Sequence, residues 1–220
     1  MNRVLLTTLT FLTATTLGAC KGTKEIHDPA VESAAKSVGS SSGTMASTPS
    51  DADEATLQTN VTSVGSSLSG LVSAHQSYAT TNGTDAEQAD PAALARAAGD
   101  VVEWDGSHLV VSTTWGETGY EFTYDVDLNI GTAPVSIDGT YDVDYSIGAA
   151  GFAIGYTVSA VYDALTFDDA GCAASGTVSV DWSYDSSIAG LGIPGATGGV
   201  DHGTVITEFT ACDTVTVSGT

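Results

Sequence analysis

The sequence predicts a mainly β fold: an antiparallel meander of seven or eight strands, as a curved sheet or a small barrel, with an N-terminal amphipathic helix packed on it. Two observations support this prediction. From residue 101 onward, apolar and polar residues alternate, which is typical of strands with one buried and one solvated face. Between residues 57 and 78, apolar residues instead recur at spacings of three and four, the period of a helix with one buried face.

The first twenty residues indicate an exported chain. Arg3 gives the start a positive charge, and an apolar, threonine-rich run follows over residues 4–17. This run is shorter than the roughly 20 apolar residues that a transmembrane helix needs, and it fits a cleaved secretory signal. The next segment, Leu17–Cys20, resembles the lipobox of bacterial lipoprotein precursors.

The resemblance implies that residues 1–19 are a lipoprotein signal peptide and that Cys20 becomes the lipidated first residue of the mature chain. The protein is then exported and held in the cell envelope by its acyl chains. Lys21 stands where an inner-membrane retention signal of well-studied Gram-negative bacteria usually has Asp, so the resemblance favours the outer membrane. The alternative is an ordinary cleaved signal peptide that a cysteine follows by chance.

Three segments are predicted behind the signal peptide. Residues 20–50 contain few large apolar side chains and are expected to form a flexible tether behind the lipidated Cys20. Residues 51–99 form a helical segment, with one helix that begins near Asp51 or Asp53 and a second, short helix over residues 92–98. The apolar stripe of the first helix consists of Leu57, Val61, Val64, Leu68, Leu71, His75 and Tyr78.

Residues 100–220 are expected to form an acidic antiparallel β domain. Turn residues separate the alternating runs, for example over residues 131–134 and 168–171. The connections are short, and short connections favour antiparallel neighbours, so successive strands should lie side by side. Cys172 and Cys212 are predicted to form a disulfide, because the envelope is oxidising and the short His and Cys spacings of a metal site are absent.

The charge distribution argues against several partners. The chain has 27 acidic and 5 basic residues, for a formal charge of −22. Residues 101–220 contain 17 acidic residues and no Lys or Arg. Binding to nucleic acid requires cations that displace counterions from phosphates, so this domain is not a nucleic-acid binder. An acidic, lysine-poor surface suits a saline habitat, and it also suits weak binding of divalent cations.

Two groups of residues are candidate sites, and each has a simpler interpretation. The first is a cation cluster on strand faces, whose simpler interpretation is a solvated surface. The run from Asp125 is not an EF-hand loop, because its sixth and twelfth residues are Ile130 and Ser136. The second is an apolar pocket beneath the helix, whose simpler interpretation is a filled core. The cation cluster comprises Asp125, Asp127, Asp142 and Asp144, and the pocket comprises Tyr120, Tyr124, Tyr141, Tyr145, Tyr156 and Trp182.

No catalytic or cofactor motif is present in the sequence, and no pair of its four His residues has helical zinc-ligand spacing. We therefore predict no enzyme, no cofactor and no firm metal site. The predicted function is a membrane-anchored envelope lipoprotein with a binding or structural role at the cell surface or the periplasmic face. The alternative is a protein that holds a lipid-like ligand between helix and sheet, by fold-level resemblance to periplasmic lipid-binding proteins with a helical lid. A hydrolase without a recognisable motif is a remote third alternative.

Overall fold

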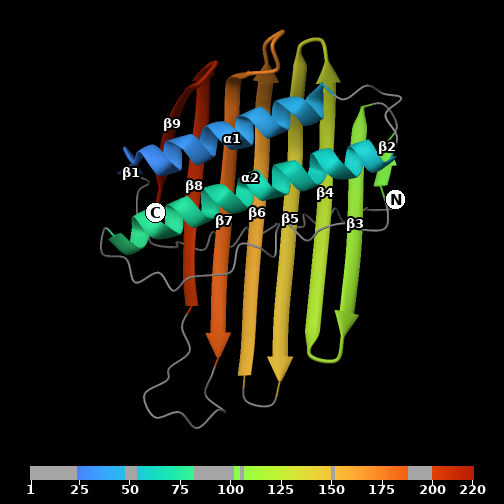
Figure 1. Cartoon of the computed structure of the whole chain (residues 1–220), viewed down its shortest axis with the longest axis vertical. Helices are drawn as coiled ribbons and strands as arrows, with labels where there is room; N and C mark the ends of the chain where they lie inside the picture. The colour runs from blue at the N-terminus through green and yellow to red at the C-terminus, as the bar shows by residue number, and fades with distance from the viewer. Residues whose placement is uncertain (1–23, 48–53, 82–101, 105–106, 150–151, 188–199) are drawn as a thin grey trace, which may run out of the picture.

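The computed structural model describes residues 24–47, 54–81, 102–104, 107–149, 152–187 and 200–220. Two helices lie in these ranges, α1 (Pro29–Ala46) and α2 (Glu54–Thr81) (Figure 1). The signal peptide, Cys20 and the short helix predicted over residues 92–98 fall outside the described residues. In the described part of the chain, no helix combines the length and the apolar character needed to cross a membrane.

The strands form one antiparallel sheet in the order β1-β9-β8-β7-β6-β5-β4-β3-β2. From β2 to β9 each strand lies beside the next in the chain, which confirms the predicted meander, and the sheet is open rather than closed into a barrel. A two-residue strand at the start of the described chain adds to the edge at β9. The strands are β1 (Lys24–Glu25), β2 (Val102–Trp104), β3 (His108–Glu117), β4 (Tyr120–Thr132), β5 (Val135–Ala149), β6 (Phe152–Phe167), β7 (Ala173–Ser187), β8 (Val200–Ala211) and β9 (Thr214–Gly219).

Helix α1 lies where the sequence predicted a flexible tether, so that prediction is wrong for residues 29–46. Asp28 caps the helix, because its carboxylate accepts hydrogen bonds from the backbone N–H groups of Ala30 at 2.8 Å and Val31 at 3.2 Å. Small residues let the helix come close to its neighbours. A methyl group on Gly39 would lie 2.5 Å from the ring of Phe209. The segment therefore gains its burial from close approach of the backbone together with a few apolar side chains such as Met45.

Helix α2 buries the predicted stripe from Leu57 to His75, and Tyr78 is half-buried. The Ser and Thr residues between the stripe positions satisfy their hydroxyls within the helix. Ser66, for example, donates a hydrogen bond to the carbonyl oxygen of Thr62 at 2.9 Å, and Ser73 donates to that of Ser69 at the same distance. A sequence of mediocre helix formers thus makes a helix of 28 residues.

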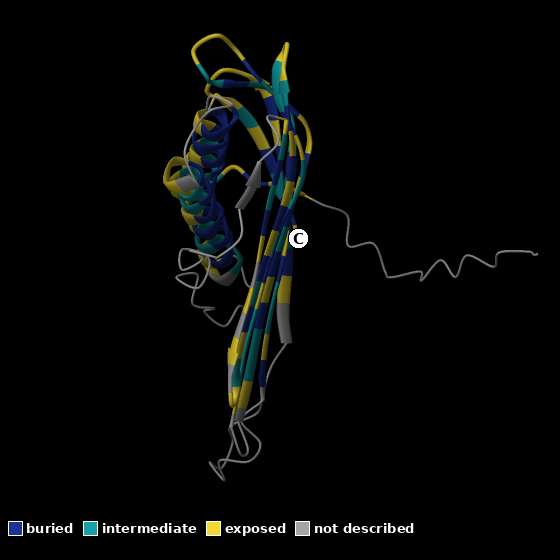
Figure 2. Ribbon diagram, turned by 90° about the vertical axis from the view of Figure 1, so that its right-hand side faces the viewer, coloured by how far each residue is buried: buried dark blue, intermediate teal, exposed yellow. Residues whose placement is uncertain are grey.

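Both helices lie on one face of the sheet, across its upper part, and the lower part of the sheet extends beyond them (Figure 2). One buried cluster joins side chains of the two helices to side chains of β3 to β9. Polar contacts also cross the boundary: the Ser42 hydroxyl donates to the Tyr162 hydroxyl at 3.5 Å, and the Trp182 indole N–H donates to Nδ1 of His75 at 3.3 Å. The opposite face of the sheet carries no described helix.

Candidate functional site

The face of the sheet that faces away from the helices carries hydroxyls and carboxylates in straight rows. Neighbouring strands place six residues directly opposite one another in one such row. The hydroxyl of Ser112 donates to the carboxylate of Asp125 at 2.5 Å, and that of Thr204 donates to Asp181. These bonds give the carboxylates hydrogen-bond donors in a domain whose residues 101–220 contain no Lys or Arg. The row consists of Ser112, Asp125, Asp142, Ser159, Asp181 and Thr204.

The four acids predicted as a cation cluster share this face, but their pairing spreads them out. Asp125 lies directly opposite Asp142, whereas Asp127 lies opposite Thr140 and Asp144 opposite Thr123. Like charges directly opposite in a sheet are destabilising. Partial burial, together with the negative charge of Glu121, raises the pKa of Asp144.

One group of described residues brings three metal-ligand atoms within 4.8 Å of one another, and it does not include these acids. It consists of Asp168, Cys172 and Cys212, and two of its atoms are sulfurs already joined in a disulfide. Disulfide sulfurs lack the thiolate charge that binds metals. Within the described residues, the four predicted acids do not bring three ligand atoms this close together.

The helix-side face carries an aromatic row across four strands. Phe122, Tyr145, Tyr156 and Tyr184 lie directly opposite one another on β4, β5, β6 and β7. Phe122 and Tyr156 are buried, while Tyr145 and Tyr184 are half-buried. The ring of Tyr120 meets that of Tyr145 edge to face at 5.2 Å. On β7, Tyr184 of this row comes two residues after Trp182, which contacts α2. The aromatic row therefore lies closer than Trp182 to the end of the sheet that holds the β3–β4 and β5–β6 hairpins.

The remaining residues of the predicted pocket belong to the packed core. Tyr124 and Tyr141 are fully buried, and their rings meet edge to face at 5.1 Å. Burial raises the pKa of both phenols, so they are neutral at physiological pH and act as packing groups. Trp182 is also buried, under α2. The six predicted residues thus separate into a core set of Tyr124, Tyr141, Tyr156 and Trp182, and the half-buried Tyr120 and Tyr145.

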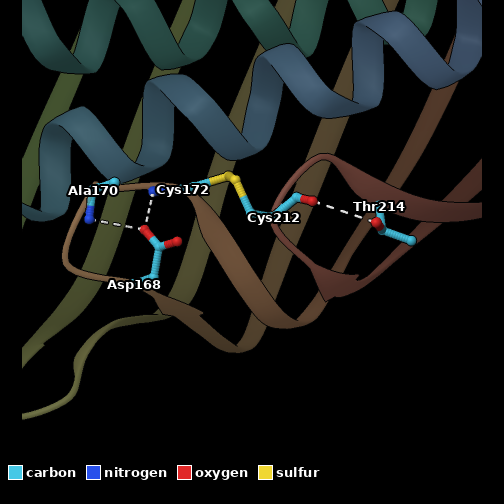
Figure 3. Close-up of a disulfide and its surroundings, with 5 residues drawn as sticks. All are labelled: Asp168, Ala170, Cys172, Cys212 and Thr214. Carbon is cyan, nitrogen blue, oxygen red and sulfur yellow. Dashed lines mark hydrogen bonds between the residues drawn. A yellow bond between two sulfur atoms is a disulfide. The ribbon is translucent and has the colours of Figure 1, made fainter.

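The predicted disulfide between Cys172 and Cys212 is confirmed (Figure 3). It joins the β6–β7 turn to the β8–β9 turn. Asp168 holds the first turn, because its carboxylate accepts from the N–H groups of Ala170 at 3.0 Å and Cys172 at 2.9 Å (Figure 3). Thr214 donates to the carbonyl oxygen of Cys212 at 3.3 Å in the second turn.

Two surface hollows lie at the ends of the sheet. One, of about 340 Å³, is bounded by α1 and the disulfide-linked turns, with Lys36 on one wall and Asp213 on another. The other, of about 380 Å³, lies over the β5–β6 hairpin, where Gly148 and Gly155 leave space beside Asp185. Both hollows are open to solvent, and neither is lined by the residues predicted for the apolar pocket.

No protein-family model, curated protein or solved structure matches this chain. Its function must therefore be argued from its own residues. Among these, His108 lies on the outer face, where its Nε2 is 2.7 Å from the carboxylate of Asp127. His27 lies 3.7 Å from the carboxylate of Glu25. The side chains of both pairs are at least partly exposed, so solvent screens the interaction between the imidazole and the carboxylate. Neither pair therefore stands out as a catalytic dyad.

The buried pair of His75 and Trp182 was not foreseen from the sequence, which showed His75 only as a member of the apolar stripe. The two residues are 107 positions apart, so only the docking of α2 brings them together. Burial lowers the pKa of His75 from 6.5 to about 4. The imidazole is therefore neutral at neutral pH, and its Nδ1 can accept the indole hydrogen bond.

The burial of His75 predicts that the free energy of unfolding depends on pH. Between pH 6.5 and 4 the unfolded chain binds a proton at His75 that the folded chain does not, so the free energy of unfolding falls as the pH falls. We expect His75 to lower the free energy of unfolding by about 2 kcal/mol when the pH falls from 7.5 to 4.5. Urea unfolding of the wild type and of His75→Phe at both pH values isolates the contribution, because the surface acids titrate in both proteins. Equal pH dependence in the two proteins would contradict the assignment.

Proposed function

We propose that the protein is a lipid-anchored, non-enzymatic component of the bacterial cell envelope, more specifically of the outer membrane. The anchor rests on the resemblance of Leu17–Cys20 to a lipobox. The helices act as a fixed cover packed on one face of the sheet, and the other face is presented to the surroundings. Binding or structural roles at that face then depend on hydroxyl and carboxylate groups.

One observation supports this proposal above the others: the two faces of the sheet differ sharply in chemistry. Under the helices, Leu68, Leu71 and Tyr141 have no exposed surface, which indicates a filled core. The outer face carries the row from Ser112 to Thr204, and residues 101–220 supply no Lys or Arg to neutralise it. A negatively charged, hydroxyl-rich sheet suits a hydrated surface that carries no reaction centre.

Cys20→Ser is expected to abolish lipidation of the expressed chain. The chain would be produced from residue 1 in a Gram-negative bacterium fed an alkyne fatty acid, and the label on the purified protein would be measured after a click reaction. Lys21→Ser is the matched control, because it changes the neighbouring residue and leaves the cysteine. Absence of label from the wild type, or its persistence in Cys20→Ser, would contradict the anchor.

A second candidate function, binding of a lipid-like ligand, is favoured by the half-buried Tyr145 and Tyr184 in the aromatic row. Aromatic rings beyond the helices offer an apolar surface with hydroxyls at its rim. If a ligand lies there, the chain from residue 21 purified from a periplasm should carry an extractable acyl molecule in native mass spectrometry. Tyr145→Ser should reduce that adduct, whereas Val161→Ser, on the outer face, should not. A ligand-free mass for the wild type would contradict ligand binding, and only the first proposal would remain.

A further inference from the structure

We infer that the β1–β9 edge of the sheet, with the N-terminal end of α1, lies against the phospholipid surface to which the protein is anchored. This inference rests on the proposed lipidation of Cys20 and adds an orientation to it. It places one defined edge of the domain at the headgroups and the opposite edge, at β2 and β3, away from them. Three observations support it: the length of the link, the way β1 is fixed, and the distribution of charge.

The link between the anchor and the folded domain is short. Cys20 and Lys24 are four residues apart, and an extended chain spans at most about 3.5 Å per residue. The lipidated residue therefore lies within roughly 14 Å of the start of β1. A tether over residues 20–50 would have let the domain move freely, but residues 29–46 of that segment belong to α1.

The start of the described chain is fixed to the sheet. Lys24 and Glu25 pair with Gly219 and Ser218 of β9, and the backbone N–H of Ile26 donates to the carbonyl oxygen of Val217 at 2.7 Å. The side chain of Ile26 is 2 % exposed. Because these contacts hold β1 in place, the short link limits the position of the whole β9 edge rather than that of a loose end.

Charge favours the same edge. Residues 21–36 contain three Lys and three acidic residues, so their net charge is zero, whereas residues 37–220 contain 24 acidic residues and one Arg. Strand β9 itself has no charged residue, and its exposed side chains include Thr214 and Thr216. An anionic bilayer repels the acidic strands over distances of about 10 Å and repels this edge less than those strands. The hydroxyls of β9 can also hydrogen-bond to headgroups.

The geometry gives a measurable height difference. In the sheet order, β9 and β3 are separated by six strand steps. At about 4.8 Å a step, β3 lies roughly 29 Å from β9. Thr216 on β9 and Thr114 on β3 are both exposed, so a small probe at either position disturbs no buried contact.

The test is energy transfer on vesicles. The lipidated protein is purified with its anchor and reconstituted into vesicles of phosphatidylethanolamine and phosphatidylglycerol that contain a rhodamine-labelled lipid. A donor fluorophore is placed at Thr216 or at Thr114 as a non-canonical amino acid. We expect transfer from position 216 to exceed transfer from position 114 by at least about threefold, because the separation of the strands approaches common transfer distances. Equal transfer, or more from position 114, would overturn the inference.

Two further measurements separate the inference from the proposal beneath it. Mass spectrometry of the N-terminal peptide reports whether Cys20 carries lipid. A peptide without lipid overturns the proposed anchor and the orientation together, whereas lipid present with equal transfer overturns the orientation alone. Insertion of 20 Gly and Ser residues between Lys21 and Gly22 should make the two transfer values converge while lipidation persists. An undiminished difference after insertion would overturn the role of the short link.

Discussion

Replacement of both Cys172 and Cys212 by Ser should lower the free energy of unfolding by about 4 kcal/mol. The two cysteines are 40 residues apart, so the disulfide removes much of the conformational freedom of the unfolded chain between them. It also ties together the two turns beside α1. Gly171 and Phe209, which leave no room for a side chain at Gly43 and Gly39 of α1, lie near this link. Loss of the disulfide therefore affects both the unfolded chain and the support of α1.

Equilibrium unfolding in guanidinium chloride would measure the loss, with the wild type under reducing conditions as an internal comparison. Reduced wild type and the double Ser variant should unfold at the same denaturant concentration. Ser175→Ala is a suitable control on the same strand, because Ser175 is exposed and its hydroxyl bonds only to that of Thr166 in the described structure. A double Ser variant as stable as the oxidised wild type would show that the disulfide does not stabilise the fold.

Two glycine substitutions should have opposite effects on stability. In Gly43→Ala, the new methyl group would lie 2.1 Å from the carbonyl oxygen of Gly171. That atom belongs to the backbone of a turn held by Asp168, so α1 must move away, and we expect a loss of about 3 kcal/mol. In Gly70→Ala, the methyl group meets no atom within 4 Å, and the helix propensity of Ala should add about 1 kcal/mol.

Each variant is the control for the other, because both change a helical Gly to Ala. Thermal unfolding followed by circular dichroism would rank the three proteins. The order Gly70→Ala, wild type, Gly43→Ala is expected, from most to least stable. If Gly43→Ala were as stable as the wild type, the close contact of α1 with the β6–β7 turn would be wrong.

The strands could be predicted because each carries its own pattern. In β4, the residues from Phe122 to Ile130 alternate buried and exposed as their apolar and polar types do. The prediction for α1 failed for a physical reason. Its segment has few large apolar residues, and its burial at Gly39 and Gly43 depends on Phe209 and Gly171, far along the chain. A local pattern carries no information about such a distant partner.

The candidate sites were predictable to a lesser degree. Alternation correctly placed Asp125 and Asp127 on one face, but only the strand register shows that Asp125 is opposite Asp142 and that Asp127 is not opposite Asp144. With this register, these acids do not bring three ligand atoms within 4.8 Å of one another in the described residues. His75 and Trp182 likewise meet only because α2 docks at a particular position on β7.

The pairing of β1 with β9 has a consequence for how the protein is made. The strand that begins at Lys24 finds its partner at Ser218 and Gly219, which are synthesised much later than Lys24 itself. Helix α1 likewise needs Gly171 and Phe209 before it can pack. Because translation proceeds from the N-terminus, β1 and α1 must wait for these later segments. A product truncated before β9 therefore lacks the partner of β1 and cannot complete this edge of the sheet.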